Sequence, residues 1–375
     1  MGEKHQERDH DPIADLIVTY NELNSSFIEE LHEEPSALEF MRFVARNTPF
    51  VVRGGAANWK ATQTWTAEYL SNFLGDETVN VAVTPFGNAD APTIHPQTGS
   101  LVFAKPHEED QPFSDFLTYV IHQEKTQGLR KSEVCYAQTQ NDNLRQEYSS
   151  LYSAVPPTIP WARIALSSLS DEEAKPEAIN LWIGNSLSTT ALHKDNYENV
   201  YVQIRGRKHF VLLPPHCLPC VNERELESGG YVRRTWKQKG GENGDDGEGE
   251  GDEEGEGEEV GAKGQLELVM EKDDEETGKQ VTVPFAIWDP DKPEENTTRY
   301  SKLAEPMRVT LEEGDMLYLP AMWYHKVSQS CSQEGICVAV NYWYDMDFTG
   351  PLYPFTSFVR AVNQQQQQQQ QNKKE

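Results

Sequence analysis

The second half of the chain is a succession of short apolar segments separated by turn residues, and this pattern restricts the fold more than any other feature. The expected strands are residues 135–140, 179–183, 199–205, 209–213, 307–311, 316–319 and 336–344. Turn signals such as Pro214-Pro215 and Gly314-Asp315 lie between them, and no long helical pattern does. Consecutive strands without intervening helices predict an antiparallel sandwich or barrel rather than a doubly wound parallel sheet.

The first third of the chain mixes helical and strand patterns. Apolar residues three and four positions apart predict helices, and short apolar runs predict strands. The expected elements are helices over 15–31, 65–74 and 113–122 and strands over 49–55 and 79–83. We therefore expect a mixed α/β region over residues 13–134 that packs on a β-core formed by residues 135–362.

Three segments have compositions that cannot bury a core. Residues 240–260 contain 11 acidic residues, 8 glycines and no basic residue. Such a stretch cannot offset its ordering entropy, so we expect a disordered acidic insertion within the strand-rich region. The charged residues 1–12 are expected to be a disordered tail. Residues 363–375, which include the glutamine run 364–371, are expected to be another.

The net charge of −28 restricts the partners of the chain. A polyanion such as DNA or RNA should be repelled, and a basic protein or peptide substrate is the electrostatic complement. No apolar run is long enough to span a membrane, so no membrane association is expected.

Five cysteines and an N-terminus without a signal-peptide pattern favour a reducing compartment, the cytoplasm, with the nucleus as a second location. Cys217 and Cys220 form a Cys-x-x-Cys pair in an expected loop. A redox pair, a zinc site with Cys331 and Cys337, and structural thiols all remain open, and structural thiols are favoured.

One short motif, His193-Lys194-Asp195, has the spacing of a metal site. On a strand, residues i and i+2 point to the same side roughly 6.6 Å apart, so His193 and Asp195 could bind one metal ion. His325, just after an apolar strand that Pro320 ends, is the best third ligand. Two histidines and a carboxylate leave coordination positions open, as in non-haem Fe(II) oxygenases, whereas a structural zinc site is closed by four ligands. The alternative is a surface His-x-Asp pair that binds nothing.

Four motifs in the same order resemble the JmjC family of Fe(II)- and 2-oxoglutarate-dependent oxygenases, in particular its lysyl (3S)-hydroxylases. They are residues 83–91, 193–199, 316–321 and 340–346. The similarity extends from about residue 15 to about residue 362 without the acidic insertion. The resemblance implies a mainly β fold with a double-stranded β-helix core, that is, a cupin-like jelly roll. An N-terminal α/β region and a C-terminal helical segment accompany that core.

The resemblance also implies roles for individual residues. His193, Asp195 and His325 match the three iron ligands. Lys208 matches the lysine that pairs with the distal carboxylate of the co-substrate 2-oxoglutarate. The other matching positions are Thr190 and Tyr136, which would hydrogen-bond that carboxylate, and Asn199 and Asn341, which would lie near the metal-proximal end. A straight strand from Asp195 would carry Lys208 too far away, so we expect the chain to curl or break before it.

The implied activity consumes O₂ and 2-oxoglutarate and hydroxylates a lysyl residue of a protein. The substrates described for the family are GTP-binding proteins of the developmentally regulated type. Histone lysine demethylase and histone-tail endopeptidase activities share the same motifs and are the enzymatic alternatives. A catalytically inactive cupin-like binding module is the alternative of another class. The family is also reported to form dimers, for which the apolar segment 355–362 is a candidate surface.

Two further groups of polar residues are candidates for the site. Tyr136, Gln138 and Gln140 alternate and would share one strand face, either as a polar wall of the pocket or as a solvated edge. The acidic residues close in sequence to the site could receive a lysine ammonium or could simply be surface residues. They are Glu198, Asp345 and Asp347.

Overall fold

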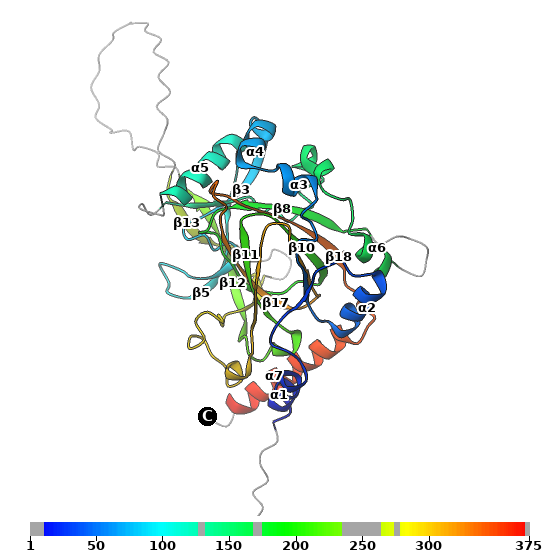
Figure 1. The fold of residues 1–375 in the computed structure, drawn as a ribbon. Coiled ribbons are helices and arrows are strands. Elements are labelled where there is room, and N and C mark those ends of the chain that lie inside the picture. The colour runs from blue at the N-terminus through cyan, green and yellow to red at the C-terminus, as the bar shows by residue number, and fades with distance from the viewer. Residues whose placement is uncertain (1–10, 127–131, 168–174, 235–263, 274–277, 372–375) are drawn as a thin grey trace, which may run out of the picture.

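A computed structural model describes residues 11–126, 132–167, 175–234, 264–273 and 278–371 (Figure 1). The expected acidic insertion, 240–260, lies outside the described residues, as do residues 1–10 and 372–375. No helix within the described ranges is both long enough and apolar enough to cross a membrane.

Two sheets form the centre of the protein, and their pairing is antiparallel except between β1 and β2. The six-stranded sheet has the order β1 (Glu29–Leu31), β2 (Phe50–Val52), β16 (Met316–Leu319), β10 (Tyr197–Arg205), β18 (Cys337–Asp345), β8 (Ala178–Gly184). The four-stranded sheet has the order β15 (Met307–Leu311), β11 (Arg207–Leu213), β17 (Tyr324–Ser330), β9 (Thr190–His193). This is the expected mainly β, cupin-like jelly roll.

The six-stranded sheet is buried on both faces. Its inner face packs with the four-stranded sheet around side chains such as Tyr201, Phe210 and Leu317. Its outer face, with Val200 and Val340, packs against the N-terminal helices. Strands covered on both faces read as continuous apolar runs, which is why β8, β10 and β18 are evident in the sequence.

Five helices from the N-terminal half lie against the barrel (Figure 1). They are α2 (Ala37–Arg46), α3 (Lys60–Thr64), α4 (Ala67–Leu74), α5 (Phe113–Lys125) and α6 (Pro160–Ala165). Helix α2 begins with a capping box of Ser36 and Glu39 and ends at Asn47 in the left-handed conformation. The Thr66 side chain caps α4, so the expected helix over 65–74 is confirmed with a start two residues later.

The expected helix over 15–31 is wrong in its second half. Helix α1 covers Pro12–Leu23, where the Asp11 side chain caps its first turn, and β1 follows from Glu29. The Asn24 side chain binds the Tyr20 carbonyl at 2.9 Å and thereby satisfies an acceptor of the last turn. Residues 29–31 then pair with β2, and this tertiary pairing overrides their helical periodicity.

Two smaller sheets stand beside the barrel. One has the order β13 (Leu266–Met270), β12 (Glu223–Arg233), β5 (Leu101–Lys105), β4 (Ala91–Ile94), and β14 (Thr282–Ala286) also pairs with β12. The other has the order β6 (His107–Pro112), β3 (Thr78–Thr84), β7 (Val134–Tyr136). The expected strand over 135–140 thus ends early, and only Ala137 continues it through an isolated bridge to Ile183.

The glutamine run is helical, which corrects the expected disordered tail over residues 363–371, while residues 372–375 lie outside the described part of the chain. Helix α7 covers Leu352–Gln371 and lies beside α1 (Figure 1). Glutamine is a good helix former, and the preceding turns are anchored because Val359 is buried. Gln366 adds a tertiary contact, since its Oε1 accepts hydrogen bonds from Tyr300 Oη at 2.5 Å and from Arg299 Nη2 at 2.6 Å.

The chain breaks at Gly206, where it crosses from β10 in one sheet to β11 in the other. Gly206 has φ +68°, and a Cβ there would lie 2.6 Å from the Ser330 carbonyl oxygen. Only glycine fits this turn. The crossing brings Lys208 into the sheet that also carries His325. It is the break in the chain that was expected between Asp195 and Lys208.

Gly206→Ala is therefore expected to lower the free energy of unfolding by at least about 2 kcal/mol, since a left-handed conformation and a steric clash are both imposed. Gly54→Ala is the matched control, because Gly54 has the same φ but no atom within 4 Å of its Cβ position. Gly54→Ala should lower the free energy of unfolding by about 1 kcal/mol. Chemical denaturation of both variants measures the difference, and equal losses would contradict the steric account.

Candidate metal centre

Three potential metal ligands converge at one end of the four-stranded sheet. His193 ends β9 and is the cross-strand partner of His325 on β17, while Asp195 follows in the loop to β10. Asp195 Oδ2 lies 3.6 Å from the Nε2 atom of each histidine. Among the described residues, this is the one group of three or more His, Cys, Asp or Glu side chains with ligand atoms close enough to hold a metal ion.

Backbone carbonyls orient both imidazole rings. His193 Nδ1 lies 2.8 Å from the Ala191 oxygen, and His325 Nδ1 lies 3.1 Å from the Trp323 oxygen. A carbonyl oxygen only accepts hydrogen bonds, so each Nδ1 carries a proton and each Nε2 atom faces the centre. The same arrangement holds histidines that bind metals.

The charges at the centre also suit a cation. Burial alone would raise the pKa of Asp195, but His193 and His325 outweigh it and lower the pKa to about 2. Burial lowers the pKa of His325 to about 4, and the neighbouring His193 adds to the shift. Near neutral pH, Asp195 is therefore ionised and His325 is neutral, which are the protonation states of metal ligands.

The turn between β16 and β17 positions both Asp195 and His325. Met322 in this turn has φ +66°, an uncommon conformation for a residue with a side chain. Its N–H donates to the Asp195 carbonyl oxygen at 2.7 Å, which ties the loop of one ligand to the strand of the next. Strained backbone of this kind is concentrated at functional sites.

Lys208 lies deep between the two sheets and is only 2% exposed. Its Nζ donates to Tyr136 Oη at 2.8 Å and to Gln329 Oε1 at 2.9 Å. No carboxylate of the described residues forms an ion pair with it. A buried ammonium without a counter-ion is costly, so this position favours an anionic ligand.

The remaining site residues from the sequence also lie on the inner surface or at its mouth. Asn199 on β10 is 3% exposed, and its Oδ1 has no hydrogen-bond partner within the described structure. Asn341 on β18 accepts a hydrogen bond from Trp182 Nε1 at 3.0 Å. Thr190 lines the cavity described below, and Tyr136 contacts Lys208. The structure brings all eight residues to one region, and their roles remain predictions.

Gly184 is a contributor that the sequence analysis missed. A Cβ at this position would lie 2.4 Å from the Tyr136 ring, so a side chain would displace the phenol from Lys208. The available signal was a glycine at the end of an apolar strand, since glycine in a strand often marks the close approach of another group.

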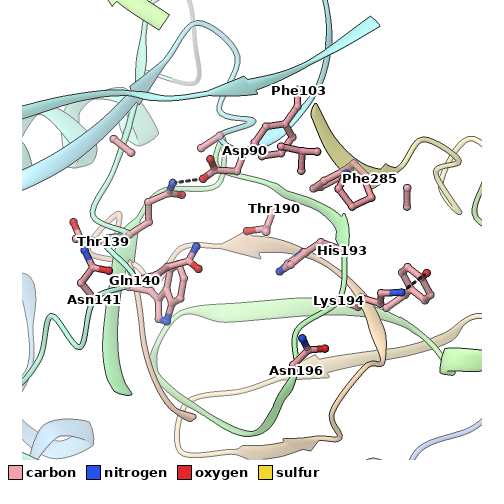
Figure 2. Close-up of a pocket in the computed structure, with 18 of the residues that line it drawn as sticks. Asp90, Phe103, Thr139, Gln140, Asn141, Thr190, His193, Lys194, Asn196 and Phe285 are labelled. Atoms are coloured by element: carbon pink, nitrogen blue, oxygen red, sulfur yellow. Dashed lines mark hydrogen bonds between the residues drawn. The ribbon is translucent and has the colours of Figure 1, made fainter. Parts of the chain in front are cut away.

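A cavity of about 600 Å³ opens onto the candidate metal centre (Figure 2). Trp182, Thr190 and His193 line its inner part, and Gln138 and Gln140 form one wall. The strand ends at Tyr136, but the two glutamines still face the cavity, which supports the polar-wall interpretation over a solvated edge.

The acidic residues proposed from sequence proximity do not line this cavity. The Glu198 side chain is buried elsewhere, where it accepts hydrogen bonds from Tyr318 Oη at 2.6 Å and Ala321 N at 3.2 Å. Asp345 and Asp347 are exposed. Asp90 does line the cavity, and sequence proximity could not have found it, because it lies about a hundred residues before His193.

The described cysteines are all free thiols. Cys217 and Cys220 are buried among apolar side chains such as Leu218 and Tyr324, and no potential metal group of the described residues includes them. Their surroundings support the structural role over a redox or zinc site.

Comparison with known proteins agrees with this fold and site. A family model described as "Cupin-like domain" matches residues 35–350. Curated JmjC proteins are similar over most of the chain, and the chain belongs to this cupin-like JmjC family of oxygenases. Oxygenases of this family use Fe(II) and 2-oxoglutarate.

Three relatives illustrate the range of activities in the family. JmjC domain-containing protein E of Dictyostelium discoideum is 31% identical over 91% of this chain and 91% of its own length. Lysine-specific demethylase JMJ32 of Arabidopsis thaliana is 33% identical over 89% and 86%. The bifunctional peptidase and (3S)-lysyl hydroxylase JMJD7 of Homo sapiens is 34% identical over 85% and 84%.

The residues present fit the family's metal and co-substrate. Two imidazole nitrogens and one carboxylate are the ligand set of non-haem Fe(II) oxygenases, and they leave positions for further ligands. The unpaired Lys208 ammonium suits one carboxylate of a dicarboxylic acid, and the unpartnered Asn199 Oδ1 offers a polar contact on the inner wall.

Proposed function

We infer that the protein is an Fe(II)- and 2-oxoglutarate-dependent hydroxylase that acts on a lysyl residue of a protein substrate. The observation that carries this proposal is the presence, inside the same barrel, of a His-Asp-His group and a buried lysine that forms no ion pair with the described residues. A binding module without activity would need neither an oriented ligand set nor an uncompensated cation.

His193, Asp195 and His325 would hold the iron. When bound, iron and 2-oxoglutarate supply the oxidising chemistry, in which O₂ and 2-oxoglutarate are consumed and hydroxylated product, succinate and CO₂ are formed. The chain supplies orientation and an apolar barrel interior that excludes water.

Strand register supports the proposed position of 2-oxoglutarate. Lys208 is the cross-strand partner of Gln329, four residues beyond His325 on β17, which corresponds to roughly 13 Å along the strand. The lysine side chain spans part of this length, and a five-carbon dicarboxylate fits the remainder. Tyr136 and Thr190 would share its distal carboxylate with Lys208, while Asn199 and Asn341 would lie near the proximal end.

The lysyl substrate rests on similarity and charge. A relative that is 34% identical is named a (3S)-lysyl hydroxylase, and the net charge of −28 suits a basic peptide. A GTP-binding protein of the developmentally regulated type is the predicted substrate. Homodimer formation and a cytoplasmic or nuclear location also remain predictions.

Lysine demethylation is the second candidate, because a relative that is 33% identical is named a lysine-specific demethylase. The same ligand set would serve both reactions. Hydroxylation leaves one oxygen on the lysine, whereas demethylation of a methylated lysine releases formaldehyde.

Mass spectrometry of peptides incubated with the full chain, Fe(II), 2-oxoglutarate and ¹⁸O₂ tests the proposal. We expect a lysine peptide to gain one ¹⁸O atom and succinate to form in equal amount. Formaldehyde from methylated peptides would favour the demethylase, and new peptide termini would favour the peptidase. Absence of succinate with every peptide would favour the inactive binding module.

A further inference from the structure

Three carboxylates are among the described residues that line the cavity over the candidate metal centre, and one of them is already neutralised. Glu223 forms ion pairs with Arg360 at 2.9 Å and with Lys194 at 3.4 Å. It also accepts a hydrogen bond from Tyr324 Oη at 3.2 Å. Lys194 and Arg360 are the lysine and arginine of the cavity wall, so both of its strong bases are committed to Glu223.

Asp90 and Glu108 are the two carboxylates that remain. Neither forms an ion pair with a basic side chain of the described residues. Lys105, at the end of β5 opposite the start of β4, pairs with Glu271 at 2.5 Å instead. Glu108 is exposed, whereas Asp90 is half-buried beside the inner part of the cavity. Asp90 is therefore the better placed of the two to receive a desolvated cation.

The backbone before Asp90 is fixed to the strand that carries Thr190 and His193. Gly87 has φ +74°, and a Cβ there would lie 2.1 Å from the Leu187 oxygen. The Gly87 carbonyl accepts a hydrogen bond from Thr189 N at 2.8 Å. Asp90 itself has φ +51°, so its side chain is presented from a tight turn.

One oxygen of Asp90 is held and the other is available. Gln138 Nε2 donates to Asp90 Oδ2 at 3.1 Å, and Figure 2 shows this hydrogen bond above the space that Thr190 and His193 line. Asp90 Oδ1 makes no hydrogen bond to the described part of the chain. A single free oxygen suits a compact ammonium better than a guanidinium, which prefers both oxygens of a carboxylate.

Aromatic side chains in the same cavity wall as Asp90 offer an apolar surface for the methylene groups of an aliphatic amine. Phe103 and Phe285 line the same cavity with their ring centroids 5.3 Å apart, and Figure 2 shows both on the Asp90 side of it. Such surfaces pack against a methylene chain while its charged end reaches a polar group.

We propose that Asp90 recognises the ε-ammonium of the substrate lysine and thereby selects lysine over uncharged and guanidinium side chains. The proposal rests on the proposed function and deepens it. Binding of the ammonium at Asp90 would direct the methylene carbons of the same side chain toward the metal centre beside His193.

The test compares three peptide libraries with random flanking residues and a fixed central lysine, arginine or norleucine. The wild-type full chain should hydroxylate the lysine library with the lowest KM. Asp90→Asn should raise that KM about 10- to 100-fold, because a hydrogen bond to a charged group is lost, and should reduce the preference for lysine over norleucine to near one. Asparagine also tolerates the left-handed conformation, so the turn should persist.

A control variant separates recognition from a general effect on the cavity. Glu108→Gln should alter the KM of the lysine library by no more than about twofold, because Glu108 is exposed. The proposal is overturned if Asp90→Asn keeps the lysine preference, or if Glu108→Gln has an equal effect. If the wild-type chain modifies no library, the proposed function fails as well, and this result is distinguishable from a failure of Asp90 alone.

Discussion

Replacing Asp195 with alanine is expected to reduce Fe(II) affinity by at least about 100-fold and to abolish turnover of 2-oxoglutarate. Even residues that only orient metal ligands contribute about 10- to 100-fold to metal affinity, so loss of a ligand should exceed that range. The variant would retain only the two imidazoles, whose Nε2 atoms each lie 3.6 Å from the present carboxylate oxygen. Anaerobic equilibrium dialysis with Fe(II) and a succinate assay measure both effects.

Asp345→Ala is the matched control for Asp195. Asp345 is exposed at the end of β18 and does not line the cavity, so its removal should change neither iron affinity nor turnover. Retention of one bound iron per chain by Asp195→Ala would contradict the assignment of the metal centre.

Lys208→Met should raise the KM for 2-oxoglutarate about 10- to 100-fold, because hydrogen bonds to a charged group are worth about 1.5–3 kcal/mol. Methionine has nearly the same length, so the barrel interior should remain packed. Without co-substrate, the variant should unfold at the same temperature as the wild type or at a higher one, because a buried cation that no carboxylate compensates has been removed. Iron affinity should not change.

Lys326→Met provides the control on the neighbouring strand, since β17 pairs with the β11 strand that carries Lys208. Lys326 lies on β17 between His325 and Val327, but it points away from the barrel interior and pairs with Asp289 at 2.7 Å. Its loss should leave the KM for 2-oxoglutarate unchanged. An unchanged KM in Lys208→Met, or a marked loss of its stability, would show that Lys208 has a structural role instead.

Most strands of the six-stranded sheet could be predicted from the sequence because burial on both faces gives them continuous apolar runs. Strands β9 and β17, which carry His193 and His325, contain polar residues and were not predicted. Strands β15 and β16 match their predicted bounds. Strand β12 carries charged residues and two glycines and was not predicted, and neither was its partner β13. The end of α1 and the helical glutamine run were mispredicted, because pairing of β1 with β2 and contacts of Gln366 are tertiary effects.

The candidate site was accessible from the sequence only in part. The two-residue spacing of His193 and Asp195 is a local signal, although Asp195 lies in the loop after β9 and not on the strand, and the residues after Pro320 identify His325. Lys208 was assigned from the family resemblance alone. The chain crosses at Gly206 from one sheet to the other and so brings Lys208 inside, and the spacing of residues in the sequence does not show this crossing. Asp90 lies within the motif over residues 83–91, but its proposed role could not be predicted there, because that role depends on which bases in the cavity are already paired.

A crystal structure of the full chain with Mn(II), which replaces Fe(II) without redox chemistry, and 2-oxoglutarate tests the central claim most directly. The account predicts one metal ion about 2 Å from His193 Nε2, His325 Nε2 and an Asp195 oxygen. It also predicts a carboxylate of 2-oxoglutarate within about 3 Å of Lys208 Nζ. A metal ion bound elsewhere, or a Lys208 that still contacts only Tyr136 and Gln329, would contradict it.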